Sequence, residues 1–447
     1  MTLIEEALTQ TTGTKACEIG PGAISAAATM FRDLFPEARK AIVVDDSNTK
    51  KVAGTFVADS LKKAGIDVVE HTINPDGSWF HATYDKVEEV RAAIASASGA
   101  VPVAVGSGTV NDLVKRACGE LGPKYLIVGT AASMDGYTAA NASITKDGMK
   151  QTLSCPAPLG CVIDSAIAAK APRDMTASGY ADLIAKIPAG ADWIIADLIG
   201  SEAIHPLAWK LVQEPLRDSL ANPEGCASGD EREVRKLCEG LAMSGFAMQA
   251  MDSSRPASGT EHQVSHYWDM EDVSVGGRPV SHGFKVGIGT IASTATLEFL
   301  LEQDISRIDR EEKVAAWWPS FDALKAELPK IFGGRPSHIR RAEMESAKAF
   351  PSHEELRREL TVIRDNWPDL SAKIRAQIMP LAEVKAKLAA VGAPVTPGEI
   401  GVTRERFRET YAGVPYMRAR YFGSDLVVHL GLMPALLDRL FGANGVI

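Results

Sequence analysis

The chain has 447 residues, of which 45% are hydrophobic and 23% are charged, as in an ordinary soluble globular protein. A chain of this length can bury a large core and is expected to form two domains. The formal net charge of −9 at pH 7 argues against a surface that binds nucleic acid or anionic membranes.

Short β-branched runs alternate with helical patterns up to about residue 165. Strands are expected at residues 41–46, 67–71, 101–105, 125–128 and 161–164, and helices at residues 49–64, 84–97 and 109–118. A polar hairpin, with strands at residues 142–145 and 150–154, is expected around the turn Lys146-Asp147-Gly148. Strands that alternate with helices predict a parallel sheet covered on both faces.

Helical patterns dominate after residue 165, with clear examples at residues 237–251, 290–302 and 355–366. Residues 222–230 and 275–279 are polar and are expected to form surface loops. The sequence thus predicts an α/β N-terminal domain with a Rossmann-like parallel sheet (residues 1–165), followed by an all-α C-terminal domain (residues 166–447). The charged, helical C-terminal third is expected to serve as scaffold or subunit contact rather than in chemistry.

Targeting and redox features point to a reducing compartment. The six cysteines are dispersed and contain no Cys-x-x-Cys pair, which favours buried thiols over disulfides or a metal cluster. The first residues lack the basic start and apolar core of a signal peptide. No uninterrupted apolar run approaches the ~18 residues of a membrane helix. A cytoplasmic protein without membrane insertion is therefore expected.

A glycine-rich turn, Gly106-Ser107-Gly108-Thr109, follows the expected strand at residues 101–105. Phosphate oxygens can approach backbone N–H groups closely there, because glycine has no Cβ and the helix N-terminus adds a favourable dipole. The turn is not a G-x-G-x-x-G fingerprint and follows the third strand, so an ordinary Rossmann dehydrogenase fits poorly. A tight connection without a ligand is the alternative.

Two more polar positions lie at neighbouring strand ends. Asp46 ends an earlier strand, where its carboxylate could accept a hydrogen bond from a ribose hydroxyl and repel a 2′-phosphate, which favours NAD over NADP. A helix N-cap beside Ser47 is the alternative for this residue. Small hydroxylated residues, Thr130 and Ser133, follow the next strand. Three such loops on one sheet edge predict a dinucleotide lying across it.

Three of the nine histidines, His262, His266 and His282, stand within 21 residues, and a lone acid, Asp182, precedes them in a helical pattern. His262 and His266 are spaced i, i+4, so both project from one helix face. An Asp/His/His set leaves one coordination position open, which suits a catalytic divalent metal such as zinc. Nickel and iron are the alternatives, and histidines that serve packing alone are another.

These residues, in this order, resemble the group III, iron-containing alcohol dehydrogenase superfamily, and within it the sn-glycerol-1-phosphate dehydrogenase branch. The resemblance runs from about Glu18 to about Leu426. It is carried by Gly106-x-Gly108-Thr109-x-x-Asp112, Thr130-Ala131-Ala132-Ser133-Met134-Asp135-Gly136, Asn141-Ala142-Ser143-Ile144, Ala171-Pro172-Arg173, Ser178-Gly179-Tyr180-Ala181-Asp182-Leu183, Ser258-Gly259-Thr260-Glu261-His262, His282-Gly283 and Met417-Arg418-Ala419-Arg420-Tyr421.

The resemblance implies a dehydroquinate synthase-like architecture with a metal held by Asp182, His262 and His282. It implies contacts to NAD or NADP from Asp46, Gly106, Ser107, Gly108, Thr109, Asp112, Thr130 and Ser133, and contacts to substrate from Asp135, Asp182 and His266. The chain departs from the family pattern at Ser107, where a glycine is usual, at Ala139, where a serine often touches the cofactor, and at Phe284, where a glutamate is common.

The expected function is that of a metal-dependent, NAD(P)-linked oxidoreductase of phospholipid metabolism, with Asp182, His262, His266 and His282 as catalytic residues. It would interconvert sn-glycerol 1-phosphate and dihydroxyacetone phosphate by hydride transfer. A small-molecule polyol phosphate is the expected partner, and the chain is expected to form a homo-oligomer, a dimer or larger. The phosphate needs a cation, for which Lys186, Arg255 and Lys285 are the nearest candidates in sequence.

Three alternatives remain open. The same fold and metal could serve glycerol or another polyol or polyol phosphate. The sugar-phosphate cyclases related to dehydroquinate synthase share the architecture but catalyse no net redox change. A non-catalytic scaffold on an enzyme fold is the third, and it would be favoured if Asp182, His262 or His282 were absent, whereas all three are present.

Overall fold

The structure of the protein, a computed structural model, describes residues 2–146, 149–271 and 273–447. Asp147 and Gly148 of the expected hairpin turn lie outside the described residues. The chain divides into two compact units. Unit 1 comprises Met1–Leu183, Pro206–Ala257 and Ala390–Gly392, and unit 2 comprises Ile184–His205, Ser258–Ala389 and Ala393–Ile447. The predicted boundary at residue 165 coincides with the end of the last sheet strand at Asp164. The two units are instead groups of segments that contact one another, and each contains several separate parts of the chain.

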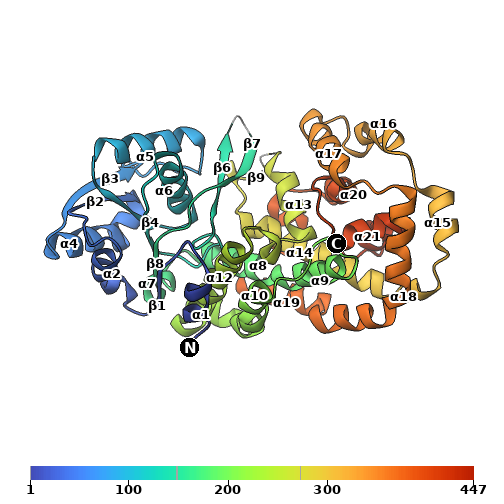
Figure 1. Ribbon diagram of the computed structural model, residues 1–447, viewed down its shortest axis with the longest axis horizontal. Helices are drawn as coiled ribbons and strands as arrows, with labels where there is room; N and C mark the ends of the chain where they lie inside the picture. The colour runs from blue at the N-terminus through green and yellow to red at the C-terminus, as the bar shows by residue number, and fades with distance from the viewer. Residues whose placement is uncertain (1, 147–148, 272) are drawn as a thin grey trace. The chain divides into compact units, whose positions relative to one another are not determined.

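A six-stranded parallel sheet forms the centre of unit 1, in the order β1-β8-β5-β4-β2-β3 (Figure 1). The strands are β1 (Ala16–Gly20), β2 (Lys40–Asp46), β3 (Asp67–Ile73), β4 (Val101–Gly106), β5 (Leu126–Gly129) and β8 (Gly160–Asp164). Five of them confirm the prediction. The edge strand β1 is missing from it, because its sequence Ala-Cys-Glu-Ile-Gly contains only one β-branched residue.

Helices cover both faces of this sheet, as its β-branched runs predict. On one face α2 (Ala27–Leu34) packs against α4 (Thr55–Lys63), and on the other α5 (Tyr84–Ser96) packs against α6 (Gly108–Leu121) (Figure 1). Buried side chains of α2 and α4 join those of the strands in one continuous apolar core. The strands are buried on both faces, which explains their near-continuous apolar sequences.

The strand order reverses between β2 and β4. From β2 the chain continues to β3 on one side, whereas from β4 it continues to β5 on the other. In register, Val44 of β2 lies beside Ala104 of β4, and Gly106 lies beside Gly129 of β5, so the three strands end at one edge. A ligand of an open parallel sheet binds outside the carboxyl ends of the strands at such a reversal.

The helix expected at residues 49–64 contains an irregularity that the sequence pattern does not predict. It runs as α3 (Ser47–Thr49), a π-helical turn η2 (Lys50–Gly54) and then α4. A Cβ atom on Gly54 would lie 2.2 Å from the Oδ2 atom of Asp45. The buried Asp45 carboxylate therefore occupies the space beside Gly54, and burial raises its pKa to about 6.

Outside the sheet, unit 1 contains the predicted hairpin and a set of helices. The hairpin strands are β6 (Asn141–Lys146) and β7 (Met149–Ser154), which pair in antiparallel fashion. The helices are α1 (Leu3–Gln10), η1 (Ala23–Ala26), α7 (Ser165–Ala168), α8 (Arg173–Ile184), α10 (Pro206–Ser219), α11 (Pro223–Ser228), α12 (Glu231–Met251) and η3 (Arg255–Ala257). The expected loop at residues 222–230 is wrong in part, because Asn222 caps α11 by accepting from the Gly225 N–H at 2.9 Å.

Unit 2 is helical, as predicted for the second half of the chain. Its helices are α9 (Lys186–Leu198), α13 (Thr260–Asp269), α14 (His282–Leu301), η4 (Ile305–Arg307), α15 (Arg310–Trp317), α16 (Phe321–Ile331), α17 (Pro336–Ala349), α18 (His353–Gln377), α19 (Leu381–Val391), η5 (Pro397–Ile400), α20 (Arg404–Gly413), η6 (Val414–Tyr416), α21 (Gly423–His429) and α22 (Met433–Phe441). The expected loop at residues 275–279 is a ribbon of β9 (Ser274–Val275) and β10 (Arg278–Pro279).

Helix α14 runs through the core of unit 2. Within the described ranges it is the one helix long and apolar enough to cross a membrane, but 83% of its most apolar window is buried inside the protein. Its glycines allow close packing: a Cβ on Gly289 would lie 2.5 Å from the Glu261 carbonyl oxygen of α13. This contact lets the backbones of α13 and α14 approach each other closely.

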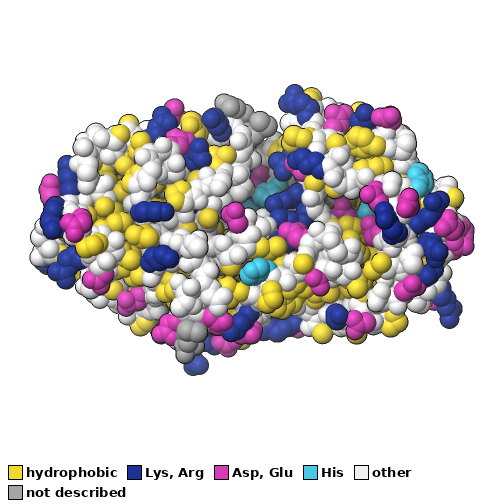
Figure 2. All heavy atoms as spheres, in the orientation of Figure 1, with side chains coloured by type: hydrophobic (Ala, Val, Ile, Leu, Met, Phe, Trp, Pro, Cys, Tyr) yellow, Lys and Arg dark blue, Asp and Glu magenta, His cyan; other side chains and the backbone are white. Residues whose placement is uncertain are grey.

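The distribution of charged side chains and the state of the cysteines can be followed in the structure. Figure 2 shows Lys and Arg side chains interspersed with Asp and Glu side chains over the face in view. All six cysteines are free thiols, and five of them are buried, while Cys17 is partly exposed. Burial raises the pKa of Cys226 to about 12, which makes this thiol unreactive at neutral pH.

Candidate active site

The glycine-rich turn lies at the sheet edge where the strand order reverses. Helix α6 begins at Gly108, and its N-cap residue, Ser107, makes no side-chain hydrogen bond to the helix. The first N–H groups of α6 are therefore left for a ligand, as phosphate binding requires. A Cβ on Gly106 would lie 2.7 Å from Val110, and one on Gly108 would lie 2.9 Å from Met134. A Cβ on Gly106 would clash with the β-branched Val110, whereas the flexible Met134 side chain beside Gly108 can move aside.

Asp46 is the N-cap of α3, which was the alternative to a ribose contact for this residue. Its Oδ1 atom accepts hydrogen bonds from the N–H groups of Asn48 at 2.8 Å and Thr49 at 2.9 Å. The carboxylate lies at the end of β2, beside the strand that carries the glycine turn. Its contact with a ribose hydroxyl stays a prediction, since a capping carboxylate keeps further acceptor capacity.

Asp112, one turn into α6, is held inside the protein. Its Oδ2 atom accepts from the Ser143 N–H at 2.9 Å, and its Oδ1 atom lies 3.7 Å from the Nζ atom of Lys115. The Lys115 ammonium also donates to the carbonyl oxygens of Gly136 at 2.6 Å and Asn141 at 2.9 Å. Asp112 therefore ties the glycine turn to the hairpin, and its expected cofactor contact stays a prediction.

The loop from Thr130 to Asp135 connects the glycine turn at the sheet edge to Asp182. The Thr130 N–H donates to the Gly106 carbonyl oxygen at 3.1 Å, which fixes the loop beside the glycine turn. A Cβ on Gly179 would lie 2.0 Å from the Ala132 carbonyl oxygen, so only glycine lets α8 approach this loop. One turn later, Asp182 accepts from the Asp135 N–H at 3.2 Å. Asp182 is completely buried.

The three histidines lie on α13 and α14, with the i, i+4 pair His262 and His266 on α13 and His282 on α14. The ring centroids of His262 and His282 lie 5.4 Å apart, and the ring of His266 lies 6.4 Å from each. His282 is the first residue of α14, and the Ser281 hydroxyl caps the helix by accepting from the Phe284 N–H at 3.3 Å. The ring of His282 is thereby placed at a helix N-terminus.

One ligand atom from each of Asp182, His262 and His282 can be chosen so that the three lie within 4.8 Å of one another. The Nδ1 atom of His262 lies 2.7 Å from Glu261 Oε1, and the Nδ1 atom of His282 lies 3.3 Å from the Ser265 hydroxyl. Nε2 is therefore the atom that each ring would offer to a metal, the arrangement that metal-binding histidines adopt. An oxygen and two imidazole nitrogens fit a divalent ion with an open position.

The carboxylates that support this site, Glu261 and Asp192, have no role assigned to them in the sequence analysis. Glu261 also accepts from the Gly259 N–H at 2.7 Å, so it is fixed before it meets His262. The buried Asp192 of α9 accepts from the Thr260 N–H at 2.8 Å and the Gly423 N–H at 2.8 Å. A carboxylate directly before a histidine is a usable sequence signal for Glu261, whereas nothing local marks Asp192.

His266 belongs to a separate polar chain on the same helices. Its Nδ1 atom lies 3.6 Å from Asp269, which also binds the Lys285 ammonium. Burial lowers the pKa of His266 below its usual value, and Asp269 opposes this shift. Lys285 is thus paired with Asp269, while Lys186 and Arg255 are 0% and 1% exposed. None of the three cations nearest in sequence is an open phosphate ligand.

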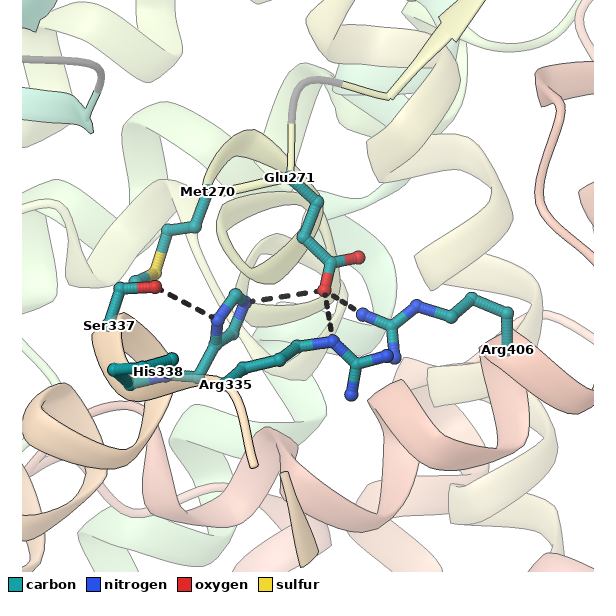
Figure 3. A pocket seen from close by; sticks show the side chains of 7 residues that line it. Met270, Glu271, Arg335, Ser337, His338 and Arg406 are labelled. Carbon is teal, nitrogen blue, oxygen red and sulfur yellow. Dashed lines mark hydrogen bonds and ion pairs between the residues drawn. The ribbon is translucent and has the colours of Figure 1, made fainter. Parts of the chain in front are cut away.

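A cluster of charges fixes the end of α13 (Figure 3). The Glu271 carboxylate lies 3.2 Å from the Nε atom of Arg335 and 3.6 Å from the Nε2 atom of His338, and it also pairs with Arg406. The cluster lines a cavity of about 420 Å³ together with Met270, Pro336 and Ser337. Glu409 also pairs with both arginines, so two carboxylates balance the two guanidinium charges and the cluster holds the C-terminal end of α13 in place.

Replacing Gly289 by alanine is expected to destabilise unit 2 and loosen the histidine pair. The new Cβ would meet backbone atoms of Glu261 at 2.5–3.1 Å, and backbone cannot move aside as a side chain can. We expect a loss of about 1–3 kcal/mol in the free energy of unfolding, measured by urea denaturation. Gly398→Ala is the matched control, since nothing lies within 4 Å of its Cβ position. Equal stability of both variants would contradict the tight packing.

Comparisons with known proteins identify the family to which the chain belongs. Residues 18–172 match the family model described as iron-containing alcohol dehydrogenase. The glycerol-1-phosphate dehydrogenase, NAD(P)+, of Bacillus licheniformis is 30% identical over 410 residues, which cover 91% of this chain and 87% of that protein. The protein of the same name from Methanothermobacter thermautotrophicus is 33% identical over 272 residues, which cover 61% and 75% of the two chains.

Solved structures share the fold at lower sequence identity. A probable glycerol dehydrogenase from Sinorhizobium meliloti superposes with a TM-score of 0.58 at 15% identity, covering 95% of this chain and 97% of that chain. Maleylacetate reductase from Rhizobium sp. superposes with a TM-score of 0.60 at 15% identity, covering 97% of both chains. From these matches and the motifs that carry them, the chain belongs to the glycerol-1-phosphate dehydrogenase branch of the iron-containing alcohol dehydrogenases.

Proposed function

We propose that this protein is a metal-dependent, NAD(P)-linked dehydrogenase that interconverts sn-glycerol 1-phosphate and dihydroxyacetone phosphate. The observation that carries the proposal is the set of ligand atoms from Asp182, His262 and His282 within 4.8 Å of one another. Relatives named glycerol-1-phosphate dehydrogenase, NAD(P)+, support the substrate and the cofactor. Glycerol or another polyol is the second candidate, since structural neighbours include a probable glycerol dehydrogenase.

Asp182, His262 and His282 would hold one divalent ion, with zinc favoured and nickel or iron as alternatives. When bound, such an ion acts as a Lewis acid that polarises the carbonyl of the ketone and stabilises the alkoxide of the alcohol. Glu261 and Ser265 keep the Nδ1 atoms of the two histidines engaged, so their Nε2 atoms are presented in a fixed orientation. The protein thereby prepares the site before substrate arrives.

The polar groups around the ion would orient the substrate. His266 is uncharged at neutral pH because burial lowers its pKa. Its neutral ring could therefore form a hydrogen bond with a substrate hydroxyl, as donor or as acceptor. Asp135, whose Oδ2 atom accepts from the Ser244 hydroxyl at 3.0 Å, would accept from a terminal hydroxyl. These two contacts would present the secondary carbon to the nicotinamide for hydride transfer.

The glycine turn and its neighbours would hold the dinucleotide. The uncapped start of α6 supplies N–H groups for the pyrophosphate, and Thr130 and Ser133 line the adjacent strand end. Asp46 would accept from the adenosine ribose, which favours NAD over NADP. Ala139 leaves out one hydroxyl that relatives of the family often use, so the cofactor is expected to be held mainly by backbone groups.

Two further parts of the proposal concern the cell and the assembly. A cytoplasmic location is supported by six free thiols, because secreted proteins of this cysteine content usually form disulfides. A homo-oligomer, a dimer or larger, is proposed with a small-molecule polyol phosphate as the other partner. Size-exclusion chromatography with light scattering tests the assembly.

A substrate panel with NADH tests the function. We expect dihydroxyacetone phosphate to be reduced with a kcat/KM roughly a hundredfold or more above that of dihydroxyacetone, because a bound phosphate adds charge-assisted hydrogen bonds. Loss of NADH absorbance at 340 nm, the usual assay for nicotinamide cofactors, follows the reaction. A preference for glycerol over sn-glycerol 1-phosphate in the oxidation direction would favour the polyol alternative. Turnover of a sugar phosphate without net change in NADH would favour the cyclase alternative.

A further inference from the structure

Three arginines meet in unit 2 around residues 417–421, which connect η6 to α21. Arg418 and Arg420 belong to this segment, and Arg341 reaches it from α17. The Nε atom of Arg341 donates to the Met417 carbonyl oxygen at 3.1 Å. The sequence analysis singled out this segment as part of the family resemblance, yet neither the metal set nor the cofactor loops use it.

The segment is held in place by specific hydrogen bonds. The Ala419 N–H donates to Glu345 Oε2 at 3.1 Å, and the Arg420 N–H donates to the Arg418 carbonyl oxygen at 2.9 Å. The Nε atom of Arg420 lies 3.3 Å from Glu202 Oε2. The backbone is thereby fixed on both sides of Arg418, so binding a ligand has to order only its side chain.

Three guanidinium groups gather in this cluster and repel one another. The carboxylates of Glu202 and Glu345 lie among them, and Glu345 is shared with Lys348, whose Nζ atom lies 3.2 Å away. Burial, followed by repulsion from Arg420 and Arg341, lowers the pKa of Arg418 to about 10, so the group stays charged at neutral pH. A bound anion would relieve the repulsion among these half-buried guanidinium groups.

The arginine cluster lies close to α13, the helix that carries His262 and His266. Helix η6, which leads directly into the segment, packs against α13. The charge of Arg418 is among the causes that lower the pKa of His266. Arg418 therefore acts on the histidine expected to contact the substrate, rather than on a remote surface.

We infer that Arg418, supported by Arg341 and Arg420, binds the phosphate group of the substrate, an inference that rests on the proposed function. A guanidinium group offers parallel N–H donors whose spacing matches two phosphate oxygens. The cations nearest to the metal ligands in sequence do not compete for this role, since Lys186 and Arg255 are buried and Lys285 pairs with Asp269. The phosphate would be recognised by a residue far along the chain from the metal ligands.

Arg418→Gln tests the inference through substrate preference. We expect the ratio of kcat/KM for dihydroxyacetone phosphate to that for dihydroxyacetone to fall roughly tenfold to a hundredfold, the range typical of one charge-assisted interaction. Arg408→Gln is the matched control, because it removes an exposed guanidinium that pairs with Asp438 at 3.0 Å. The control is expected to keep the wild-type ratio, and an unchanged ratio in Arg418→Gln would overturn the inference.

Binding of inorganic phosphate separates this inference from the proposed function. Isothermal titration calorimetry is expected to detect phosphate binding to the wild-type protein and a roughly tenfold or greater weakening in Arg418→Gln. If the wild type reduces no dihydroxyacetone phosphate but binds phosphate through Arg418, the anion site stands and the substrate assignment fails. If the wild type reduces dihydroxyacetone phosphate and both variants bind phosphate equally, the inference alone fails.

Arg418→Lys covers the case in which the glutamine variant does not fold. Lysine keeps the charge but loses the planar pair of donors, so a smaller fall in the same ratio, roughly threefold to tenfold, is expected. The melting temperature measured by circular dichroism identifies a folded variant. A folded lysine variant with the wild-type ratio and wild-type phosphate affinity would overturn the role of the guanidinium group.

Discussion

Replacing His282 by alanine is expected to leave a folded protein that has lost its metal and its turnover. The change removes one of three ligand groups at the start of α14, where the side chain is only partly buried, so the core is unaffected. We expect kcat to fall roughly a thousandfold or more, because the Lewis acid supplies several kcal/mol of transition-state stabilisation. Steady-state kinetics and elemental analysis of the same preparation measure both effects.

The control for this variant is His353→Ala. His353 is an exposed residue at the start of α18 and belongs to no metal set among the described residues. We expect it to keep the metal content, kcat and melting temperature of the wild type. If His282→Ala retained a full equivalent of metal together with wild-type kcat, the assignment of this ligand would be wrong.

Replacing Gly108 by valine is expected to abolish cofactor binding while the metal stays bound. The new side chain would stand at the first turn of α6, where N–H groups are left for the pyrophosphate. Its Cβ would meet the flexible side chain of Met134 at 2.9 Å, which can move aside, so the fold should survive. We expect the Kd for NADH to rise roughly a hundredfold, since hydrogen bonds to a charged group are lost.

Two measurements make this result specific. Fluorescence titration gives the Kd for NADH, and elemental analysis gives the metal content of the same variant. Gly108→Ala adds a smaller side chain and is expected to weaken NADH binding less than valine does. Wild-type affinity for NADH in Gly108→Val would show that the dinucleotide does not use this turn.

The order of strands and helices could be predicted from the sequence because the pattern is local. Five β-branched runs bounded by polar residues predict five of the six strands, and the glycine turn follows β4 as expected. The edge strand β1 and the π-helical turn at Lys50–Gly54 could not be predicted, since both depend on distant or buried partners. β1 pairs with β8, more than a hundred residues away, and Gly54 packs against Asp45.

The candidate metal ligands can be proposed from residue type alone, but their supporting groups cannot. Three histidines close in sequence and one acid in a helical pattern are visible in the chain itself. Which carboxylate orients His262, and whether it is the neighbouring Glu261 or a distant residue, depends on side-chain directions. The role of Asp192 cannot be predicted for the same reason. This residue of α9 accepts a hydrogen bond from the Thr260 N–H and so fixes the start of α13.

Nearness in sequence to the expected metal ligands does not lead to the phosphate ligand that we propose. Lys186 and Lys285 lie next to the metal ligands along the chain, yet one is buried and the other is paired with Asp269. Arg418 lies in the C-terminal third, which the sequence pattern assigns to scaffold or subunit contact. Packing of η6 against α13 brings this segment to the histidine helix, a relation that no local pattern contains.

Removal and return of the metal tests the central claim most directly. Protein treated with a chelator and freed of metal by gel filtration should reduce dihydroxyacetone phosphate with NADH at a negligible rate. Addition of a single equivalent of a divalent ion should restore turnover in the wild type and leave Asp182→Asn inactive. Full activity in protein that elemental analysis finds free of divalent metal would contradict the account.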